Sequence, residues 1–163
     1  MSYAAIVVAR SAQGWTASEV DLDEVEDVDG AAELAREVSA GAHPTVLFIE
    51  EEDEYLAILR VDGDFDDPRV FVSDAKAVDN FRLAALLLDG IGPEPDDDDD
   101  DEDAPAGHDS EPAGDVDLLS DLGTPARSLV ALCDQEGTLP SDVVAAVCEN
   151  AGCLAELEML REA

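Results

Sequence analysis

Residues 45–75 read TVLFIEEEDEYLAILRVDGDFDDPRVFVSDA, and this stretch decides the fold class. It contains three segments rich in β-branched and aromatic residues, a composition typical of β-strands, namely Thr45–Glu50, Tyr55–Val61 and Arg69–Ser73. Acidic turns separate the three segments. Because short turns join strands that run in opposite directions, the stretch predicts three successive strands of a mostly antiparallel sheet.

The residues at the start of the chain predict a hairpin that joins this sheet. Tyr3–Arg10 is a short apolar run, typical of a buried strand. Ser11–Gly14 has turn chemistry, and Gly14 can adopt a positive φ. The segment from Trp15 to Leu22 alternates between two faces and forms the second strand of the hairpin.

Two amphipathic helices are predicted, one before and one after the three strands. In the first, apolar residues recur at helical spacing from Ala31 to Val38, and either Asp29 or Gly30 can be its N-cap. The second is expected from about Ala75 to Asp89, with Asp74 as its N-cap. Residues 1–92 therefore predict an α+β domain of order ββαβββα, whose helices cover one face of a mostly antiparallel sheet.

The segment after this domain is dominated by acid. Residues 94–103 read EPDDDDDDED, and residues 93–115 contain no apolar residue other than three alanines. This composition predicts an acidic disordered linker, extended by charge repulsion, because it cannot bury enough surface to offset the entropy of ordering. Residues 116–163 predict a small all-α unit of short helices. It is too small for a substantial core of its own, so it should pack on the first domain or on a partner.

The charge is strongly unbalanced, with 42 Asp and Glu against 8 Lys and Arg and a formal net charge of -34 at pH 7. Twelve of these acids lie in residues 93–115, which leaves 30 acidic against 8 basic residues and a formal charge of -22 elsewhere. Binding to nucleic acid or to an anionic membrane surface relies on Lys and Arg, so direct contact with either is not expected. Three explanations of the acidity stay open: adaptation to high salt, a basic protein partner, or solubility.

The cysteines and histidines indicate neither disulfides nor a metal site. Cys133, Cys148 and Cys153 are odd in number and lie in apolar surroundings, which fits a reduced cytoplasm. Zinc needs about four ligands, and the two histidines, His43 and His108, are remote in sequence. No signal peptide or membrane helix is predicted, so we expect a cytoplasmic protein with no bound metal.

Known catalytic and ligand-binding motifs are not matched. The segment Asp62–Asp67, DGDFDD, resembles the start of an EF-hand loop, but its sixth position is Asp67 in place of Gly and its twelfth is Ser73 in place of Glu. The sequence has no G-x-S-x-G, P-loop or G-x-G-x-x-G motif. We therefore expect a hairpin turn at DGDFDD, no catalytic residue, no cofactor and no enzymatic activity.

Strand directions place several acidic loops at one end of the predicted sheet. If directions alternate, the second, third and fifth strands all end where the first begins. The candidate partner-binding residues are those of the loops at this end: Asp21, Asp23, Glu24, Glu26, Asp27, Glu50, Glu51, Glu52, Asp53, Glu54 and Asp74. Loops carry charge in most proteins, so a purely solvent-exposed end is the competing interpretation.

Two other functional classes stay open at this point. Trp15 and Tyr55, with nearby carboxylates, could line a pocket of a small-molecule-binding or enzymatic α+β domain. The acidic surface could instead mimic nucleic acid and bind basic proteins in general. Carboxylates gathered in a concave pocket would favour the first class, and acid spread over a convex surface would favour protein binding.

Several segments together resemble a small actinobacterial family of tRNA adenosine deaminase-associated proteins. These segments are AAIVVAR, GWTASEVDLDEVEDVDGAAELAREV, FIEEEDEYLAILRV, RVFVSDAKAV and the tail LGTPARSLVALCDQEGTLPSDVVAAVCENAGC. In that family a strand ending in a tetrapeptide like VSDA, here Val72–Ala75, leads into a helix. The resemblance implies an accessory protein whose partner is a tRNA adenosine deaminase, and it implies no catalytic residue. The chain lacks the H-x-E and P-C-x-x-C zinc motifs of the deaminase itself.

Overall fold

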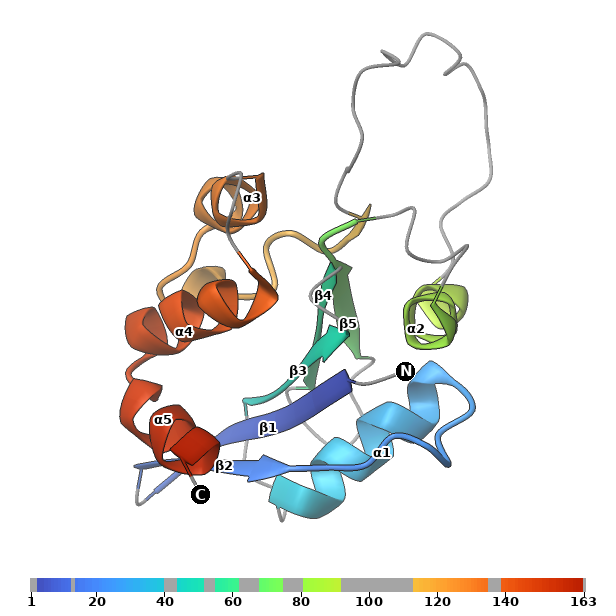
Figure 1. Ribbon diagram of the computed structural model, residues 1–163, viewed down its shortest axis with the longest axis horizontal. Helices are drawn as coiled ribbons and strands as arrows, with labels where there is room; N and C mark the ends of the chain where they lie inside the picture. The colour runs from blue at the N-terminus through green and yellow to red at the C-terminus, as the bar shows by residue number, and fades with distance from the viewer. Residues whose placement is uncertain are drawn as a thin grey trace, which may run out of the picture.

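The computed structural model describes residues 3–12, 14–39, 44–51, 55–61, 68–74, 81–91, 113–134 and 139–162. A central sheet has helices on both of its faces (Figure 1). The elements, in chain order, are β1 (Tyr3–Ser11), β2 (Gly14–Glu19), α1 (Val28–Ser39), β3 (Thr45–Glu51), β4 (Tyr55–Val61), β5 (Arg69–Val72), α2 (Arg82–Ile91), β6 (Ala113–Gly114), η3 (Ser120–Leu122), α3 (Ala126–Asp134), α4 (Pro140–Ala151) and α5 (Leu154–Glu162).

The strands form one sheet in the order β2-β1-β3-β4-β5-β6, and neighbouring strands are antiparallel. The helix α1 connects β2 to β3, which are parallel and flank β1. The predicted α+β class, the mostly antiparallel sheet and the order ββαβββα over residues 1–92 are confirmed. No helix of the described residues is long and apolar enough to cross a membrane.

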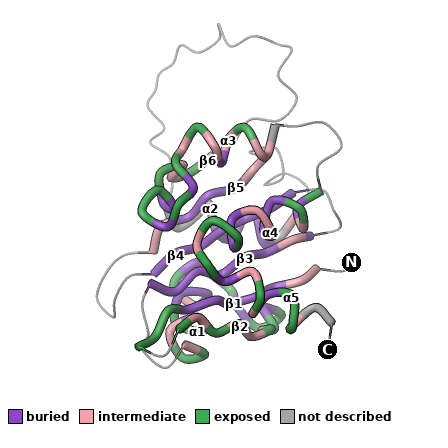
Figure 2. Tube along the Cα trace, turned by 90° about the vertical axis from the view of Figure 1, so that its left-hand side faces the viewer, coloured by how far each residue is buried: buried purple, intermediate pink, exposed green. Residues whose placement is uncertain are grey.

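Successive residues of each strand enter two separate cores. Val7, Leu47 and Leu59 belong to the core beneath α1 and α2, whereas Val8 and Phe48 belong to the core beneath the C-terminal helices. We call these two sides of the sheet the α1 face and the α4 face. Because both faces are covered, all seven residues of β4 are buried (Figure 2). This explains why β1, β3 and β4 appear as largely continuous apolar runs without polar alternation.

The C-terminal helices bury the α4 face of the sheet. Leu118, Val144, Val147 and Leu157 are each at most 2% exposed and pack in one cluster with strand residues such as Phe48. In Figure 1 α4 and α5 lie on one side of the sheet and α1 and α2 on the other. Of the two packing partners expected for residues 116–163, the sheet is therefore the one observed.

Two arginines of the sheet hold the start of this C-terminal part. The guanidinium of Arg60, which is 5% exposed, donates to the Leu118 carbonyl at 2.6 Å and to both carboxylate oxygens of Asp121. Arg69 Nε donates to Asp115 Oδ2 at 2.7 Å. A planar guanidinium that meets a carboxylate with two parallel hydrogen bonds fixes orientation as well as distance.

The predicted linker ends earlier than expected. Residues 113–115 were assigned to it, but Ala113 and Gly114 form β6, which pairs with Val72 and Phe71 of β5. The Asp115 backbone N–H also donates to the Val70 carbonyl at 2.7 Å. Two residues, one of them Gly, carry no strand signal in sequence, which is why the prediction fails here. The rest of the predicted linker lies outside the described residues.

Both predicted helix starts need correction. The helix α1 begins two residues before Gly30, with Asp27 as its N-cap: Asp27 Oδ1 accepts from Gly30 N at 2.8 Å, and its carbonyl accepts from Ala31 N. The helix α2 begins at Arg82, so Asp74 does not cap it; residues 75–80 lie outside the described residues.

Candidate functional site

The pairing registers bring several strand ends together at one end of the sheet, which we call the lower end. Tyr3, where β1 begins, is paired with Glu51, where β3 ends, and Glu51 is paired with Tyr55, where β4 begins. Val20, just after β2, donates its N–H to the Ala5 carbonyl. Ser73, just after β5, donates its N–H to the Leu56 carbonyl. The loop 20–27 and the residues around Glu50 and Asp74 therefore share this end.

The candidate partner-binding residues differ in accessibility. Five of them are exposed in the loop before α1: Asp21, Asp23, Glu24, Glu26 and Asp27. Glu50 and Asp74 are half-buried. Glu52, Asp53 and Glu54 lie outside the described residues. The loop 20–27 thus supplies the exposed carboxylates among the described candidate residues of the lower end.

Glu51 is not an exposed turn residue, and it is the least accessible of the candidate partner-binding residues that the structure describes. Its side chain is 4% exposed and accepts a hydrogen bond from the Tyr55 hydroxyl at 2.7 Å. Tyr55 is itself buried and packs on Phe81, with ring centroids 5.1 Å apart. Glu51 is the last residue of β3 and its side chain lies on the α1 face beside Tyr55, which is why it is buried even though the turn begins directly after it.

Asp27 also has a structural task, because its carboxylate caps α1 as described above. A carboxylate at a helix N-terminus is favoured by the orphan N–H groups and by the helix dipole. It is exposed, so it contributes charge to the lower end as well.

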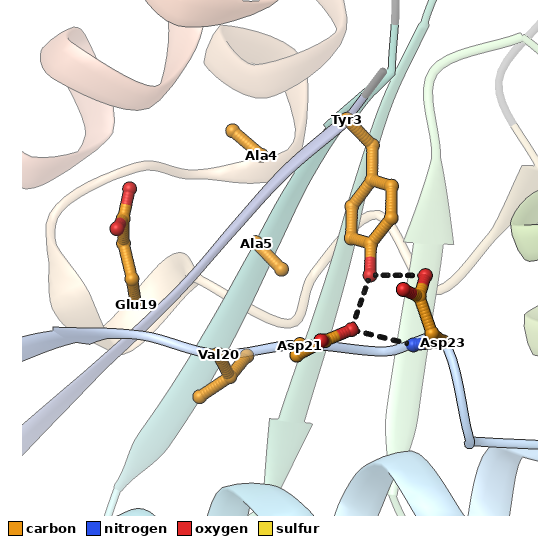
Figure 3. A pocket seen from close by; sticks show the side chains of 7 residues that line it. All are labelled: Tyr3, Ala4, Ala5, Glu19, Val20, Asp21 and Asp23. Carbon is orange, nitrogen blue, oxygen red and sulfur yellow. Dashed lines mark hydrogen bonds between the residues drawn. The ribbon is translucent and has the colours of Figure 1, made fainter. Parts of the chain in front are cut away.

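Tyr3 organises the start of the acidic loop, as Figure 3 shows. Its hydroxyl is shared between Asp21 Oδ1 and Asp23 Oδ1, each 3.1 Å away, and accepts from the Leu22 N–H at 2.7 Å. Burial, together with the hydrogen bonds to the two carboxylates, raises the pKa of Tyr3 to about 12. The Asp23 backbone N–H, 2.9 Å from Asp21 Oδ1, and the Tyr3 hydroxyl hold the pKa of Asp21 below its ordinary value. Asp21 is therefore ionised near neutral pH.

These residues border an open groove of about 500 Å³ at the lower end of the sheet (Figure 3). Its walls carry the carboxylates of Glu19, Asp21 and Asp23, and Ala4, Ala5 and Val20 supply small apolar side chains. Sequence reasoning missed both Tyr3 and the groove, because Tyr3 was counted only as the first residue of a strand. The signal that could have found it is an aromatic with a polar tip at a strand start, where the tip can reach a neighbouring loop.

The arginines of the sheet lie at the opposite end. Arg10 stacks over the Trp15 ring, 5.7 Å from its centroid, near the β1–β2 turn. Arg60 and Arg69 are paired with each other in the β4–β5 register and are occupied by Asp121 and Asp115. Among the described residues, the exposed carboxylates of the loop 20–27 thus lie at the end opposite to Arg10, Arg60 and Arg69, and the last two arginines are neutralised by Asp121 and Asp115.

Trp15 and Tyr55 do not share a pocket, so that expectation is wrong. Trp15 packs with the core of the α4 face, whereas Tyr55 belongs to the core of the α1 face. The sheet lies between the two rings, because Trp15 is paired with Arg10 in a register whose side chains point to the α4 face.

The cysteines lie on the α4 face. Cys148 and Cys153 are at most 1% exposed, and Cys133 is half-buried. Cys148, whose carbonyl accepts from the Cys153 N–H at the end of α4, holds the pKa of the Cys153 thiol below its ordinary value through a thiol hydrogen bond. In the described part of the chain no group of three or more His, Cys, Asp or Glu side chains is arranged to hold a metal ion. His43 and the DGDFDD segment lie outside that part.

A scan against protein-family models matched residues 3–154 to the family described as Rv3753c-like tRNA adenosine deaminase-associated protein. The match covers the sheet and the C-terminal helices as far as α4, and it ends at the first residue of α5. A search of curated proteins and a search of solved structures gave no match.

Proposed function

Since the chain belongs to the Rv3753c-like tRNA adenosine deaminase-associated protein family, we propose that it is a non-catalytic accessory protein that binds such a deaminase through its acidic lower end. The observation that carries the proposal is that five exposed carboxylates of the loop 20–27 gather at the lower end, whereas the arginines of the sheet lie at the opposite end.

Electrostatic complementarity between the two proteins supports this proposal. An enzyme that grips tRNA must present Lys and Arg to the phosphates, and that surface is basic in the absence of RNA. An acidic end can face it, either as a competitor for RNA or as a chaperone of the free enzyme. Complementary fields of this kind mainly raise the association rate, and salt screens them.

The test measures association between the purified protein and a tRNA adenosine deaminase from the same organism at several salt concentrations. The variant Glu24→Lys/Glu26→Lys reverses two exposed side chains of the lower end. It should lower the association rate about tenfold and flatten its salt dependence, because the steering field is reversed where contact occurs. The matched control Glu149→Lys/Glu158→Lys makes the same change of net charge on the exposed sides of α4 and α5.

Equal rates for both variants would rule out the lower end as the docking surface. A nucleic-acid mimic without a single partner makes a different prediction: an unrelated basic protein, such as cytochrome c, would then associate as fast as the deaminase. Absence of any complex between the wild-type protein and the deaminase would contradict the proposal as a whole.

A further inference from the structure

The groove at the lower end contains an open strand edge as well as carboxylates. Alternate residues of β1 hydrogen-bond to β3 and to β2: Arg10 N–H donates to the Pro44 carbonyl on the β3 side, and the Ala5 carbonyl accepts from Val20 N–H on the β2 side. By this alternation the backbone N–H and C=O of Tyr3 point toward the β2 side.

No strand of the described residues covers that position. The partner of Tyr3 in the β2 register would be Leu22, but the Leu22 N–H donates to the Tyr3 hydroxyl instead of its carbonyl. Neither backbone group of Tyr3 has a partner among the residues that the structure describes. The chain turns away after Val20, and the space that it leaves is the groove. An unpaired strand edge is a template for an added strand.

The side chains around this edge select for positive charge. Glu19, Asp21 and Asp23 are exposed on the walls of the groove and form no ion pair with any described residue. Ala4, Ala5 and Val20 leave room beside them for an aliphatic stem. The Tyr3 hydroxyl holds Asp21 and Asp23 close to each other, so two carboxylates are presented side by side.

We propose that this groove receives an extended basic segment of a protein partner, whose main chain pairs with Tyr3 and whose arginine side chain binds Asp21 and Asp23. The inference rests on the proposed function, since it specifies which part of a basic partner is recognised. A planar guanidinium with five donors fits two adjacent carboxylates beside an aromatic ring better than an ammonium does. One oxygen of each carboxylate is already engaged by Tyr3, which disfavours a shared calcium ion, because calcium takes six to eight oxygen ligands.

The first experiment uses the full-length protein and a probe peptide, acetyl-Gly-Arg-Gly-amide, with the citrulline peptide as an uncharged isostere. Amide resonances are followed by NMR during titration at about 0.15 M NaCl, where non-specific attraction is screened. We expect shifts centred on Tyr3, Ala5 and Val20 with arginine and none with citrulline. Shifts spread over all acidic surfaces, or the same shifts with citrulline, would overturn the proposal. If calcium chloride produces the same shifts at a lower concentration than the peptide does, the groove is a metal-cation site and the proposal that it binds arginine is wrong.

The second experiment compares two pairs of substitutions that each remove two negative charges. Asp21→Asn/Asp23→Asn lies in the groove and keeps side chains that can accept from Tyr3. Glu24→Gln/Glu26→Gln lies in the same loop outside it. The first pair should weaken peptide binding about tenfold, as loss of a charge-assisted contact does, and the second less than about twofold. Equal losses of peptide affinity in the two variants would show general electrostatic attraction and no specific binding in the groove. The NMR spectrum of each free variant reports whether its fold is retained.

A failure of the groove proposal can be distinguished from a failure of the proposed function. If the deaminase binds the wild-type protein and the groove variant equally well, the docking proposal stands and the groove inference fails. If the peptide binds the groove while the deaminase forms no complex, the groove takes another basic segment and the deaminase proposal fails.

Discussion

Single residues at the lower end differ in role although they look alike in sequence. Glu51 and Glu24 are both acidic and both lie in predicted loops at the same end of the sheet, yet Glu51 is buried against Tyr55 and Glu24 is exposed. The difference in burial arises because Glu51 is still part of β3 and its side chain points into the α1 face, whereas Glu24 lies in a loop. A two-residue periodicity gives the direction of a side chain in a strand, but it does not give the residue at which a strand stops.

This difference gives a prediction for charge reversal. Glu51→Lys places an ammonium in the buried position beside Tyr55 and should lower the free energy of unfolding by about 3 kcal/mol, because a buried charge without a counter-ion is costly. Glu24→Lys should change it by less than about 0.5 kcal/mol, as expected at an exposed site. Urea denaturation of both variants measures the two values. Similar small changes would mean that the Glu51 side chain can turn out to solvent.

At the scale of elements, the order of strands and helices could be predicted because each carries a strong local signal. The strands from Thr45 to Val72 are apolar and β-branched, and α1 has a clear apolar stripe. The strand β6 could not be predicted, since Ala113 and Gly114 have no strand propensity and are held by β5 and by the Arg69–Asp115 ion pair. Such an element is determined by its neighbours, and only the tertiary structure shows it.

The same element gives the second prediction. Gly114 has a φ of +98°, and a Cβ at this position would lie 2.1 Å from the Val70 carbonyl oxygen. Gly114→Ala must therefore push β6 away from β5, and it should lower stability by about 3 kcal/mol. Gly14→Ala is the control, because Gly14 has a φ of +122° with nothing within 4 Å of its Cβ position. It carries backbone strain alone and should cost about 1 kcal/mol. Equal losses of melting temperature would show that β6 contributes nothing beyond strain.

At the scale of the whole molecule, the sequence predicted the parts but not how they are joined. The apolar side chains on the α4 face, among them Ile6, Val8 and Phe48, show that this face must be covered, and residues 116–163 supply the cover. The pairing of Arg60 with Asp121 and of Arg69 with Asp115 orients that cover, and neither pair is visible in sequence because their members are far apart along the chain. The groove beside Tyr3 was missed for a similar reason, since it exists only where β1 extends beyond β2.

The last prediction concerns the net charge. Replacing residues 94–111 with a short Gly-Ser linker removes 11 of the 42 acidic residues. The fold should survive, because α2 and β6 contact each other and a short connection can join them. If the acidic run is only a tether, its removal reduces self-repulsion, so the melting temperature at low salt should rise by a few degrees, roughly 1 kcal/mol. At about 0.5 M NaCl, where the charges are screened, the two proteins should melt together. A variant that melts many degrees below the wild-type protein at both salt concentrations would show that the run packs on the folded part.

The comparison also bears on the origin of the acidity. A protein adapted to high salt should gain stability from added salt even after the run is removed, because the rest of the chain keeps its surplus of negative charge.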